Sequence, residues 1–273
     1  MLLIYFIRFT RNNKFNLLFG VMETLFIGRN LIFLPEVQST NSYAMNLLKN
    51  VNPPEGTLVY ANYQTQGKGQ RGSAWNAEPA SNLTASLILK PFFLNLRNQF
   101  YLYLISAMAC YDTMAEILDS SQFDIKIKWP NDILINKKKI AGILIENNIL
   151  NNQVNGCVVG IGINVNQSSF DASFNATSIS ILLANNFPVF SVLETLCSNF
   201  EKHYLALKNE KFNSIQGNYL QHLFGLNTWR QFEINGAIKS LMILGVSDRG
   251  LLLLREENDS IMEVDVKQIR WFY

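Results

Sequence analysis

The chain is poor in the residues that build disulfide frameworks and metal sites. Its 273 residues include three cysteines and two histidines, and Cys110, Cys157 and Cys197 lie far apart. Scattered cysteines in odd number form no disulfide framework, and two histidines complete no zinc-binding pattern. A nucleophilic Cys–His pair is formally possible, but His203 and His222 lie in polar, helix-like sequence without a partner motif. We therefore expect buried thiols in a reducing, cytoplasmic compartment and no protein-bound metal.

Long apolar runs and blocks of like charge are also missing. No stretch reaches the ~20 apolar residues of a membrane-spanning helix, so no membrane partner is expected. The 23 basic and 21 acidic residues give a net charge of +2, which argues against DNA binding through a basic face. The 48% of hydrophobic residues is enough for a sizeable core, and we expect one large domain and one small one. Small molecules or proteins are the expected partners.

The first 21 residues fit neither a signal peptide nor a membrane anchor. An apolar patch at 2–7 precedes Arg8, Arg11 and Lys14, whereas a signal peptide places its positive charges first. A second methionine, Met22, offers another start. We expect residues 1–21 to be an extension outside the working protein.

The most distinctive stretch is Gln64–Trp75, which contains three glycines and two cationic residues. Runs rich in β-branched and aromatic residues at 57–63 and 83–89 predict a strand on each side of it. The glycines have G-x-G-x-x-G spacing, but a dinucleotide site needs a helix after them, and here turn residues lead into a strand. We expect a mobile cationic loop whose backbone N–H groups approach anionic oxygens, with an ordinary solvated hairpin loop as the alternative.

Hydrophobic periodicity predicts the other elements. Strands are expected at 30–37, running out at Pro35, and at 57–63, 83–89, 124–128, 133–135, 140–145 and 156–166, and helices at 42–48, at 98–119 as one amphipathic helix, and as a pair within 188–220. Alternation places Lys126 and Lys128 on one face of their strand, which Pro130 ends. Ser39 and Thr40 precede a helix, so helix capping competes with ligand binding as their role.

The pattern changes after 225–229 to short strands separated by turns. These strands are expected at 230–234, 237–246, 250–255, 260–264 and 268–272. Short strands of this kind predict a small barrel separate from the main sheet. The expected domains are therefore 22–224 and 225–273.

Three places could carry chemistry. Lys128 stands at a strand end, where it could reach a phosphate or a developing oxyanion, although a solvated lysine is the simpler reading. Gly160 and Gly162 remove side chains from one strand face, which suits a thin ligand or a closely packed helix. Phe170 and Phe174 lie in a polar loop that could fold over a bound base.

Five motifs together resemble the biotin protein ligases. They are Ser39–Asn41, Gln64–Trp75, Lys128–Asp132, Lys139–Glu146 and Gly160–Asn164, and they occur in the order and approximate spacing of that family. Each motif is weak alone, whereas five in register are a specific match that extends from about residue 31 to the C-terminus. This resemblance favours the functional reading of each motif over the structural one.

The resemblance implies an α+β fold with a class II tRNA-synthetase-like catalytic domain, in which helices flank a mixed sheet, and a small SH3-like C-terminal domain. It also implies two half-reactions. Biotin and Mg-ATP give biotinyl-5′-adenylate and pyrophosphate, and a lysine of a biotin carboxyl carrier protein then attacks the adenylate. Biotin and ATP are thus the implied substrates, with Mg²⁺, and the carrier protein is the implied partner.

The resemblance also implies the site residues. Lys128 and Lys68 would be catalytic, and the set that binds biotin or the adenylate would be Ser39, Thr40, Asn41, Gln64, Gly67, Lys68, Gly69, Gln70, Arg71, Trp75, Lys128, Gly142, Gly160, Gly162 and Asn164. Of these, Ser39–Asn41 and Gln64 would bind the biotin head group, and the backbone of Gly69 and Gln70 would close over carboxylate and phosphate. Gly160 and Gly162 would floor the biotin pocket.

Two departures from the family pattern stand out. Lys68 and Gln70 occupy loop positions where the family usually has arginine, which removes one charge and the bidentate contacts. Only 38 residues precede Ser39, too few for a DNA-binding winged helix, so a monofunctional enzyme is expected. A lipoate or octanoate ligase of the same fold is one alternative, although its Arg-rich Gly-Gly-Gly and His-Asp signatures are missing. A non-catalytic biotin-binding regulator is the other, and Lys128 argues against it.

Overall fold

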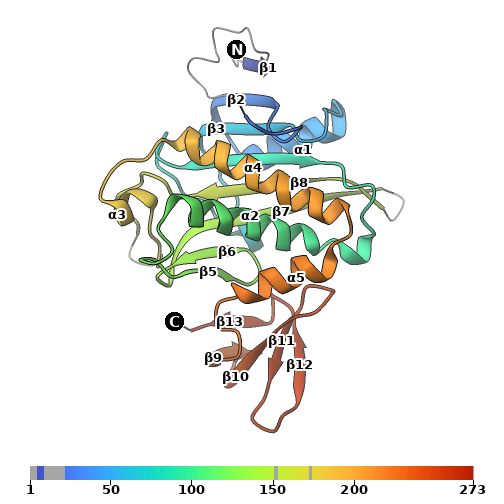
Figure 1. Cartoon of the computed structure of the whole chain (residues 1–273), viewed down its shortest axis with the longest axis vertical. Coiled ribbons are helices and arrows are strands. Elements are labelled where there is room, and N and C mark those ends of the chain that lie inside the picture. The colour runs from blue at the N-terminus through green and yellow to red at the C-terminus, as the bar shows by residue number, and fades with distance from the viewer. Residues whose placement is uncertain (1–4, 9–21, 151–152, 172–173, 273) are drawn as a thin grey trace.

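The structure is a computed structural model that describes residues 5–8, 22–150, 153–171 and 174–272. It contains one large mixed sheet with helices on both faces and a second, smaller antiparallel sheet formed by the C-terminal part (Figure 1). The predicted α+β fold class is thereby confirmed.

The large sheet has eight strands in the order β1-β2-β3-β4-β8-β7-β6-β5. Its strands are β1 (Tyr5–Arg8), β2 (Asn30–Val37), β3 (Leu58–Gln64), β4 (Leu83–Leu89), β5 (Ile125–Lys128), β6 (Asp132–Ile135), β7 (Lys138–Leu150) and β8 (Gln153–Ile163). Neighbours are antiparallel except β2 and β3, which are parallel because helix α1 connects them. The loop Gln64–Trp75 joins β3 to β4, as the apolar runs on both sides of it predicted.

The helices cover the two faces of this sheet unequally. They are α1 (Thr40–Asn50), α2 (Tyr101–Ile117), α3 (Ile179–Leu183), α4 (Val189–Lys208) and α5 (Phe212–Gln221), with short 3₁₀ helices η2 (Gln70–Gly72) and η3 (Leu96–Asn98). Helices α2 and α4 pack together across one face (Figure 1), while α1 contacts β3, β4, β7 and β8. One face is therefore covered by two long helices and the other by α1.

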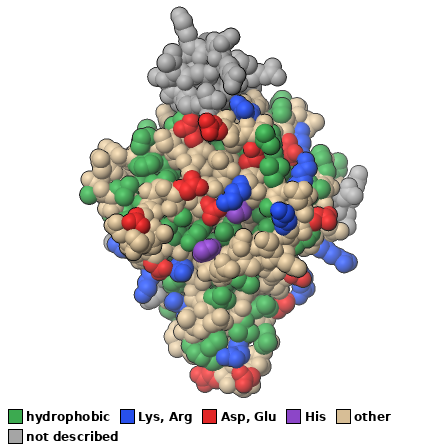
Figure 2. Space-filling model, viewed as in Figure 1, with side chains coloured by type: hydrophobic (Ala, Val, Ile, Leu, Met, Phe, Trp, Pro, Cys, Tyr) green, Lys and Arg blue, Asp and Glu red, His purple; other side chains and the backbone are tan. Residues whose placement is uncertain are grey.

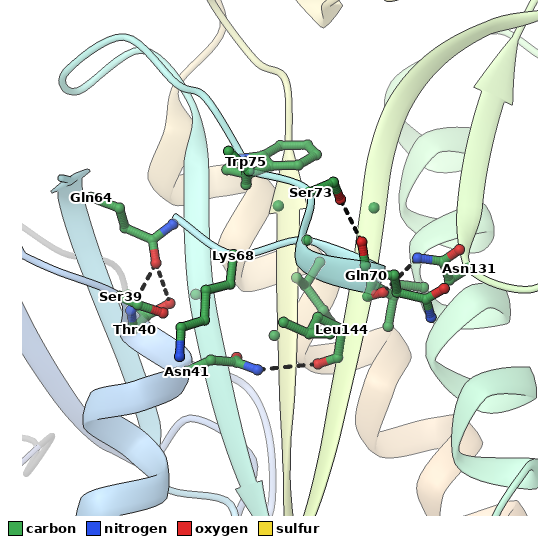
Figure 3. Close-up of a pocket in the computed structure, with 18 of the residues that line it drawn as sticks. Ser39, Thr40, Asn41, Gln64, Lys68, Gln70, Ser73, Trp75, Asn131 and Leu144 are labelled. Carbon is green, nitrogen blue, oxygen red and sulfur yellow. Dashed lines mark hydrogen bonds between the residues drawn. The ribbon is translucent and has the colours of Figure 1, made fainter. Parts of the chain in front are cut away.

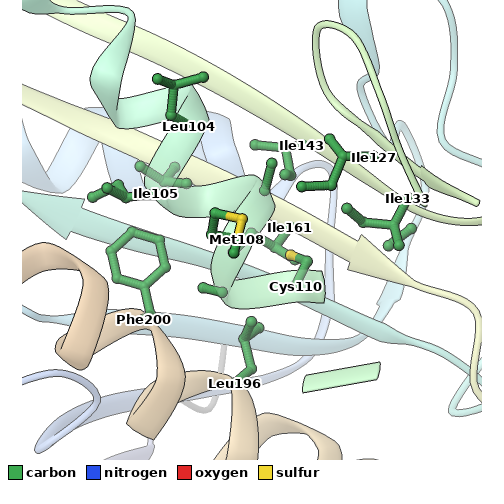
Figure 4. Close-up of a cluster of buried hydrophobic side chains, with 14 of the residues drawn as sticks. Leu104, Ile105, Met108, Cys110, Ile127, Ile133, Ile143, Ile161, Leu196 and Phe200 are labelled. Carbon is green, nitrogen blue, oxygen red and sulfur yellow. The ribbon is translucent and has the colours of Figure 1, made fainter. Parts of the chain in front are cut away.

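Alternation along the strands proves that these are opposite faces. In β3, Leu58 and Tyr60 belong to the large core beneath α2 and α4, whereas Val59 and Ala61 belong to a small core with Ala44 of α1. Figure 4 shows the large core, where side chains of α2 and α4 meet isoleucines of the central strands. Alternate residues of a strand thus pack against different helix layers.

The C-terminal part forms a five-stranded antiparallel sheet in the order β12-β11-β10-β9-β13. Its strands are β9 (Trp229–Ile234), β10 (Ala237–Val246), β11 (Leu252–Arg255), β12 (Ile261–Val264) and β13 (Ile269–Trp271). All five strands were expected within a few residues. Phe232, Leu241 and Leu254 of this sheet join the large core, so apolar packing connects the two sheets.

Several expected element limits need correction. The first expected strand does not end at Pro35 but runs on to Val37, because Glu36 and Val37 continue the parallel pairing with β3. The helix expected at 98–119 spans 101–117 and is buried on most sides rather than amphipathic, because it lies between the sheet, α4 and α5. Helix α3 was not expected; Ser178 caps its start.

Membrane and nucleic-acid partners were argued against on composition. Within the described residues no helix is long and apolar enough to span a bilayer. On the face shown in Figure 2, acidic and basic side chains are interspersed and form no single basic patch.

The predicted N-terminal extension, 1–21, lies outside the described residues except for β1. The backbone of 5–8 pairs with the edge of β2, and Met22 is only 1% exposed within the large core. That residues 1–21 are not part of the working protein stays a prediction.

A buried carboxylate anchors the segment that leads into β2. Glu201 of α4 is 7% exposed and accepts backbone hydrogen bonds from Leu25, Phe26 and Ile27 at 2.6, 2.8 and 3.1 Å. Three donors converge on one carboxylate because residues 25–27 turn there before the strand begins. These bonds connect the start of the large sheet to the helix layer.

We predict that Glu201→Ala lowers the free energy of unfolding by about 2–4 kcal/mol, because three buried N–H groups lose a charged acceptor. Urea unfolding measures the loss. Glu194→Ala, two turns earlier on the same helix, is the control and is expected to change stability by less than about 0.5 kcal/mol. Equal stability of the two variants would contradict the anchoring role of Glu201.

Candidate active site

A row of paired residues crosses the large sheet on one face. Lys128 of β5 pairs with Asp132, Asp132 with Gly142, Gly142 with Gly162, and Gly162 with Thr84 of β4. Directly opposed residues of antiparallel strands place their side chains on the same face. Four strand pairings thus align a lysine, a carboxylate and two glycines.

This row lies on the face that carries α1. Val158 packs in the small core with Leu48 of α1, and Gly160 and Gly162 follow it at intervals of two residues. Helix α1 covers Val158 and reaches Gly160 through Asn41, so the strip from Gly162 to Asp132 lies beyond the helix. A cleft opens there.

The cleft has a cavity volume of about 190 Å³, below the ~300–1,000 Å³ of typical small-ligand sites. Its walls come from α1, the loop Gln64–Trp75 and strands β4, β6, β7 and β8. The lining residues are Ser39, Thr40, Asn41, Gln64, Lys68, Gly69, Gln70, Ser73, Ala74, Trp75, Ala85, Asn131, Asp132, Lys139, Gly142, Ile143, Leu144, Gly160, Ile161 and Gly162. Residues far apart in sequence therefore meet around one cavity (Figure 3).

The α1 end of the cleft is a network of uncharged polar groups. Gln64 Oε1 accepts hydrogen bonds from the Thr40 backbone N–H at 2.7 Å and from its hydroxyl at 3.0 Å (Figure 3). The hydroxyl of Ser86 donates to Asn41 Oδ1 at 2.6 Å. Ser39 accepts from Ser42 N, so it caps α1 as well as lining the cleft. Capping and ligand binding, weighed as alternatives from the sequence, are compatible.

Asn41 is fixed most tightly. Its Nδ2 donates to Glu146 Oε2 at 2.9 Å and to the Leu144 carbonyl at 3.3 Å, and the side chain is 4% exposed. A Cβ added to Gly160 would lie 2.1 Å from Asn41 Oδ1. The first glycine of the flat strand face therefore makes room for Asn41.

The second glycine makes room for an indole. A Cβ on Gly162 would lie 2.4 Å from the ring of Trp75, and one on Gly142 would lie 3.2 Å from it. The Trp75 side chain thus lies flat on both glycines at the end of the cleft (Figure 3). Its Nε1 is buried without a hydrogen-bond partner within the described structure. The open glycine face holds a ring of the protein itself in this structure.

The glycine loop is folded on itself. The Trp75 N–H donates to the Gly67 carbonyl at 2.9 Å, and the Gly69 N–H donates to the Ser73 carbonyl at 2.7 Å. No long helix follows the glycines, only η2 and then β4, which agrees with rejecting a dinucleotide site. The Gly69 N–H would have to exchange its present bond to reach a ligand oxygen. The side chain of Arg71 lies outside the described part of the chain.

Two lysines also line the cleft, Lys68 and Lys139. Lys139 Nζ pairs with Asp132 Oδ1 at 2.6 Å and lies 5.8 Å from the ring centroid of Trp75. Figure 3 shows the Lys68 side chain extending from the loop toward Asn41. Among the described residues, no cluster of three or more His, Cys, Asp or Glu side chains could hold a metal ion.

Lys128 is at the end of the row and does not line the cleft. Its neighbours Asn131 and Asp132 do, and its Nζ lies 5.5 Å from the ring centroid of Trp271 in the small sheet. Burial lowers the pKa of the Lys128 ammonium, and the negative charge of Asp132 partly offsets that effect. A half-buried cation therefore stands beside the cleft, on the same sheet face.

A second hollow, with a cavity volume of about 190 Å³, adjoins the cleft and shares Trp75 and Lys139 with it. Asn164, Phe170 and Phe174 contribute to its walls. The two phenylalanines belong to the polar loop that the sequence suggested could fold over a bound base. Asn164 is 4% exposed and donates through Nδ2 to the Thr177 carbonyl at 3.0 Å. Trp75 stands between two compartments.

Most of the predicted site residues thus converge, although three described ones do not line the first cleft: Gly67, Lys128 and Asn164. Sequence reasoning missed Asn131, Asp132 and Lys139 as site residues, although all three lie within the motifs quoted for the resemblance. It also missed Ser86, which binds Thr40 and Asn41 from β4. A serine inside a fully buried strand is the signal that could have found it.

Several known proteins are similar to this chain in sequence and in fold. The family model described as "Biotin/lipoate A/B protein ligase family" matches residues 33–164. The bifunctional ligase/repressor BirA of Bacillus subtilis (strain 168) is 34% identical over 248 residues, covering 89% of this chain and 74% of that protein. A biotin–[acetyl-CoA-carboxylase] ligase of Paracoccus denitrificans is 35% identical over 132 residues, covering 48% of this chain and 53% of that protein.

A solved structure of biotin protein ligase from Aquifex aeolicus, in complex with biotin and ATP, superimposes with a TM-score of 0.73 at 26% identity and covers 89% of this chain and 98% of that one. The chain belongs to the biotin/lipoate A/B protein ligase family.

We predict that Gly160→Ala lowers the free energy of unfolding by about 1–3 kcal/mol, because the new methyl group displaces Asn41 from its buried network. Gly217→Ala is the matched control: a Cβ there meets nothing within 4 Å, and alanine in helix α5 is expected to stabilise by up to about 1 kcal/mol. Thermal unfolding of both variants measures the difference. A Gly160→Ala protein as stable as the parent would show that Asn41 moves without cost.

Proposed function

We propose that the chain is a biotin protein ligase. It activates biotin with ATP to biotinyl-5′-adenylate and transfers biotin to a lysine of a biotin carboxyl carrier protein. The expected carrier protein is of the acetyl-CoA carboxylase type. One observation carries the proposal: a network of uncharged donors and acceptors beside α1 lines the same cleft as two lysines, Lys68 and Lys139. Biotin has the matching polarity, with a neutral ureido ring and an anionic tail.

The polar end suits the ureido ring. Ser39, Thr40, Asn41 and Gln64 supply hydroxyl and amide groups that are already oriented by one another and by Ser86. Neutral groups in a buried network bind a neutral ring without the cost of burying an unpaired charge. The floor of the pocket is the strand face at Gly160, with Leu144 opposite it on β7.

The lysines of the cleft suit the carboxylate of biotin and the phosphates of ATP. Lys68 comes from the loop and Lys139 from β7, and Gln70 and Arg71 belong to the same loop. The second hollow, with Asn164 and two phenylalanines, is the proposed place of the adenine. Trp75, between the compartments, would border both ligands.

In the first half-reaction an oxygen of the biotin carboxylate attacks the α-phosphorus of ATP, and pyrophosphate leaves. Lys128 and Lys68 are the proposed catalytic residues, because cations near the reacting oxygens stabilise the charge of the pentavalent phosphorus. In the second half-reaction the carrier amine attacks the acyl carbon of the adenylate, and AMP leaves. Mg²⁺ enters with ATP as part of the substrate, held mainly by phosphate oxygens.

The proposed division of labour assigns 22–224 to catalysis and 225–273 to the SH3-like unit. A cytoplasmic location stays a prediction, supported by three buried free thiols.

Pyrophosphate release tests the function directly. We expect release that requires both biotin and ATP, and no release when lipoate or octanoate replaces biotin. Release with lipoate or octanoate but not with biotin would favour the ligase alternative. Biotin binding without any release would favour a non-catalytic regulator.

We predict that Lys128→Ala slows adenylate formation by roughly 10²–10³ while leaving the protein folded, which is the usual effect of losing one charged transition-state stabiliser. Lys126→Ala is the matched control, because Lys126 lies on the same strand and face but forms its contact with Asp124 at 3.7 Å. Pre-steady-state pyrophosphate release compares the two. Near-normal release by the Lys128 variant would remove this residue from its role.

Gln70 allows a directional test, because it lines the cleft where related loops usually carry arginine. We predict that Gln70→Arg lengthens the lifetime of the bound adenylate by up to about tenfold, since a charged hydrogen bond to phosphate exceeds a neutral one by roughly 1 kcal/mol. Release of radiolabelled adenylate in a single turnover measures the lifetime. Unchanged or faster release would show that Lys68, Lys139 and the loop backbone already satisfy the phosphate.

A further inference from the structure

The C-terminal sheet reaches the proposed catalytic lysine. Trp271 is the last residue of β13, and Lys128 Nζ lies 5.5 Å from the centroid of its ring. A cation within about 6 Å of an aromatic ring centroid is attracted by the ring's electrons. Lys128 is thus held from outside its own sheet.

The backbone around Lys128 is also tied to segments outside the large sheet, namely the link between α5 and β9 and the small sheet. Ile127 N donates to the His222 carbonyl at 2.8 Å, and Phe224 N donates to the Ile127 carbonyl at 2.8 Å. On the other side, the Trp129 indole N–H donates to the Gly250 carbonyl at 3.0 Å, and this contact is buried. Both neighbours of Lys128 in the sequence are therefore fixed. The position of the Lys128 ammonium group then depends on the conformation of its side chain.

Trp271 is itself held in place by aromatic neighbours. Its ring meets Phe232 edge-on, with centroids 5.0 Å apart, and Phe224 at 6.2 Å. The backbone of Trp271 is also fixed, because β13 pairs with β9 and places Trp271 opposite Phe232. The ring is thus held beside the end of β5, where Lys128 pairs with Asp132 at the edge of the cleft.

We propose that Trp271 is a positioning residue for the adenylation step: its indole holds the Lys128 ammonium at the edge of the cleft, so that the small sheet sets the rate of the chemistry without contacting the substrates. The inference rests on the proposed function for its kinetic consequence. The contact between Trp271 and Lys128 itself does not depend on it.

Two substitutions separate the ring's electrons from its bulk. Trp271→Leu keeps apolar volume against Phe232 but has no aromatic face, whereas Trp271→Phe keeps a weaker aromatic face. We expect Trp271→Leu to lower kcat for pyrophosphate release about 5- to 30-fold, or about 1–2 kcal/mol, with the KM for biotin within about twofold of the parent. Trp271→Phe is expected to recover most of the loss.

Trp229→Ala is the matched control. Trp229 lies in the same small sheet and forms a similar contact, with Arg255 at 5.9 Å, but it is 42% exposed and its cation is a different residue. We expect its kcat to stay within about twofold of the parent. If Trp229→Ala loses as much activity as Trp271→Leu, the effect is a general weakening of the sheet and the proposal is wrong. It is equally wrong if Trp271→Leu keeps the parent kcat.

A spectroscopic measurement tests the contact without any activity. The ε-CH₂ protons of Lys128, identified by the signal that Lys128→Arg removes, should be shifted upfield by the indole ring and return toward ordinary lysine values in Trp271→Leu. An unshifted signal in the parent overturns the inference even if the enzyme is active. A shifted signal in a protein that releases no pyrophosphate would instead refute the proposed function and leave the contact standing.

Discussion

The cleft depends on one constraint, the antiparallel register that connects β5, β6, β7, β8 and β4. Because the register shifts of these strands lie outside the row itself, Lys128, Asp132, Gly142 and Gly162 fall into one line on one face of the sheet. A shift of one residue in any of these pairings would turn side chains to the opposite face, beneath α2 and α4. The positions of the charged side chains and of the two glycines in the row are therefore set by strand pairing.

The two faces of the sheet have separate tasks. The face beneath α2 and α4 is filled with apolar side chains and provides most of the hydrophobic stabilisation. The face with α1 is only partly covered, and the first residues of that helix contact the cleft rather than the core. Thr40 and Asn41 are buried yet polar, and each is satisfied by partners from β3, β4 or β7. Such a network keeps polar groups in fixed positions and leaves few of them to reorganise on binding.

The small sheet is joined to this arrangement at the end of β5. The hydrogen bond from the Trp129 indole to the Gly250 carbonyl and the ring of Trp271 connect the two sheets where the row of paired residues ends. The sheets also share one apolar core, so the small sheet is packed onto the catalytic part rather than linked by a flexible tether. The contact between Trp271 and Lys128 is the basis of the positioning role that we propose for the small sheet.

The sequence by itself indicated every strand except β1, most helices, the change of pattern near residue 225 and the glycine positions, because hydrophobic periodicity and turn residues act over a few neighbours. Its motifs also indicated the family. Only the tertiary structure decided that Gly160 faces Asn41 while Gly162 and Gly142 face Trp75, that Asp132 and Lys139 pair inside the cleft, and that Trp271 meets Lys128. These contacts join residues far apart in the chain, and their partners follow from sheet order and register, which no local pattern encodes.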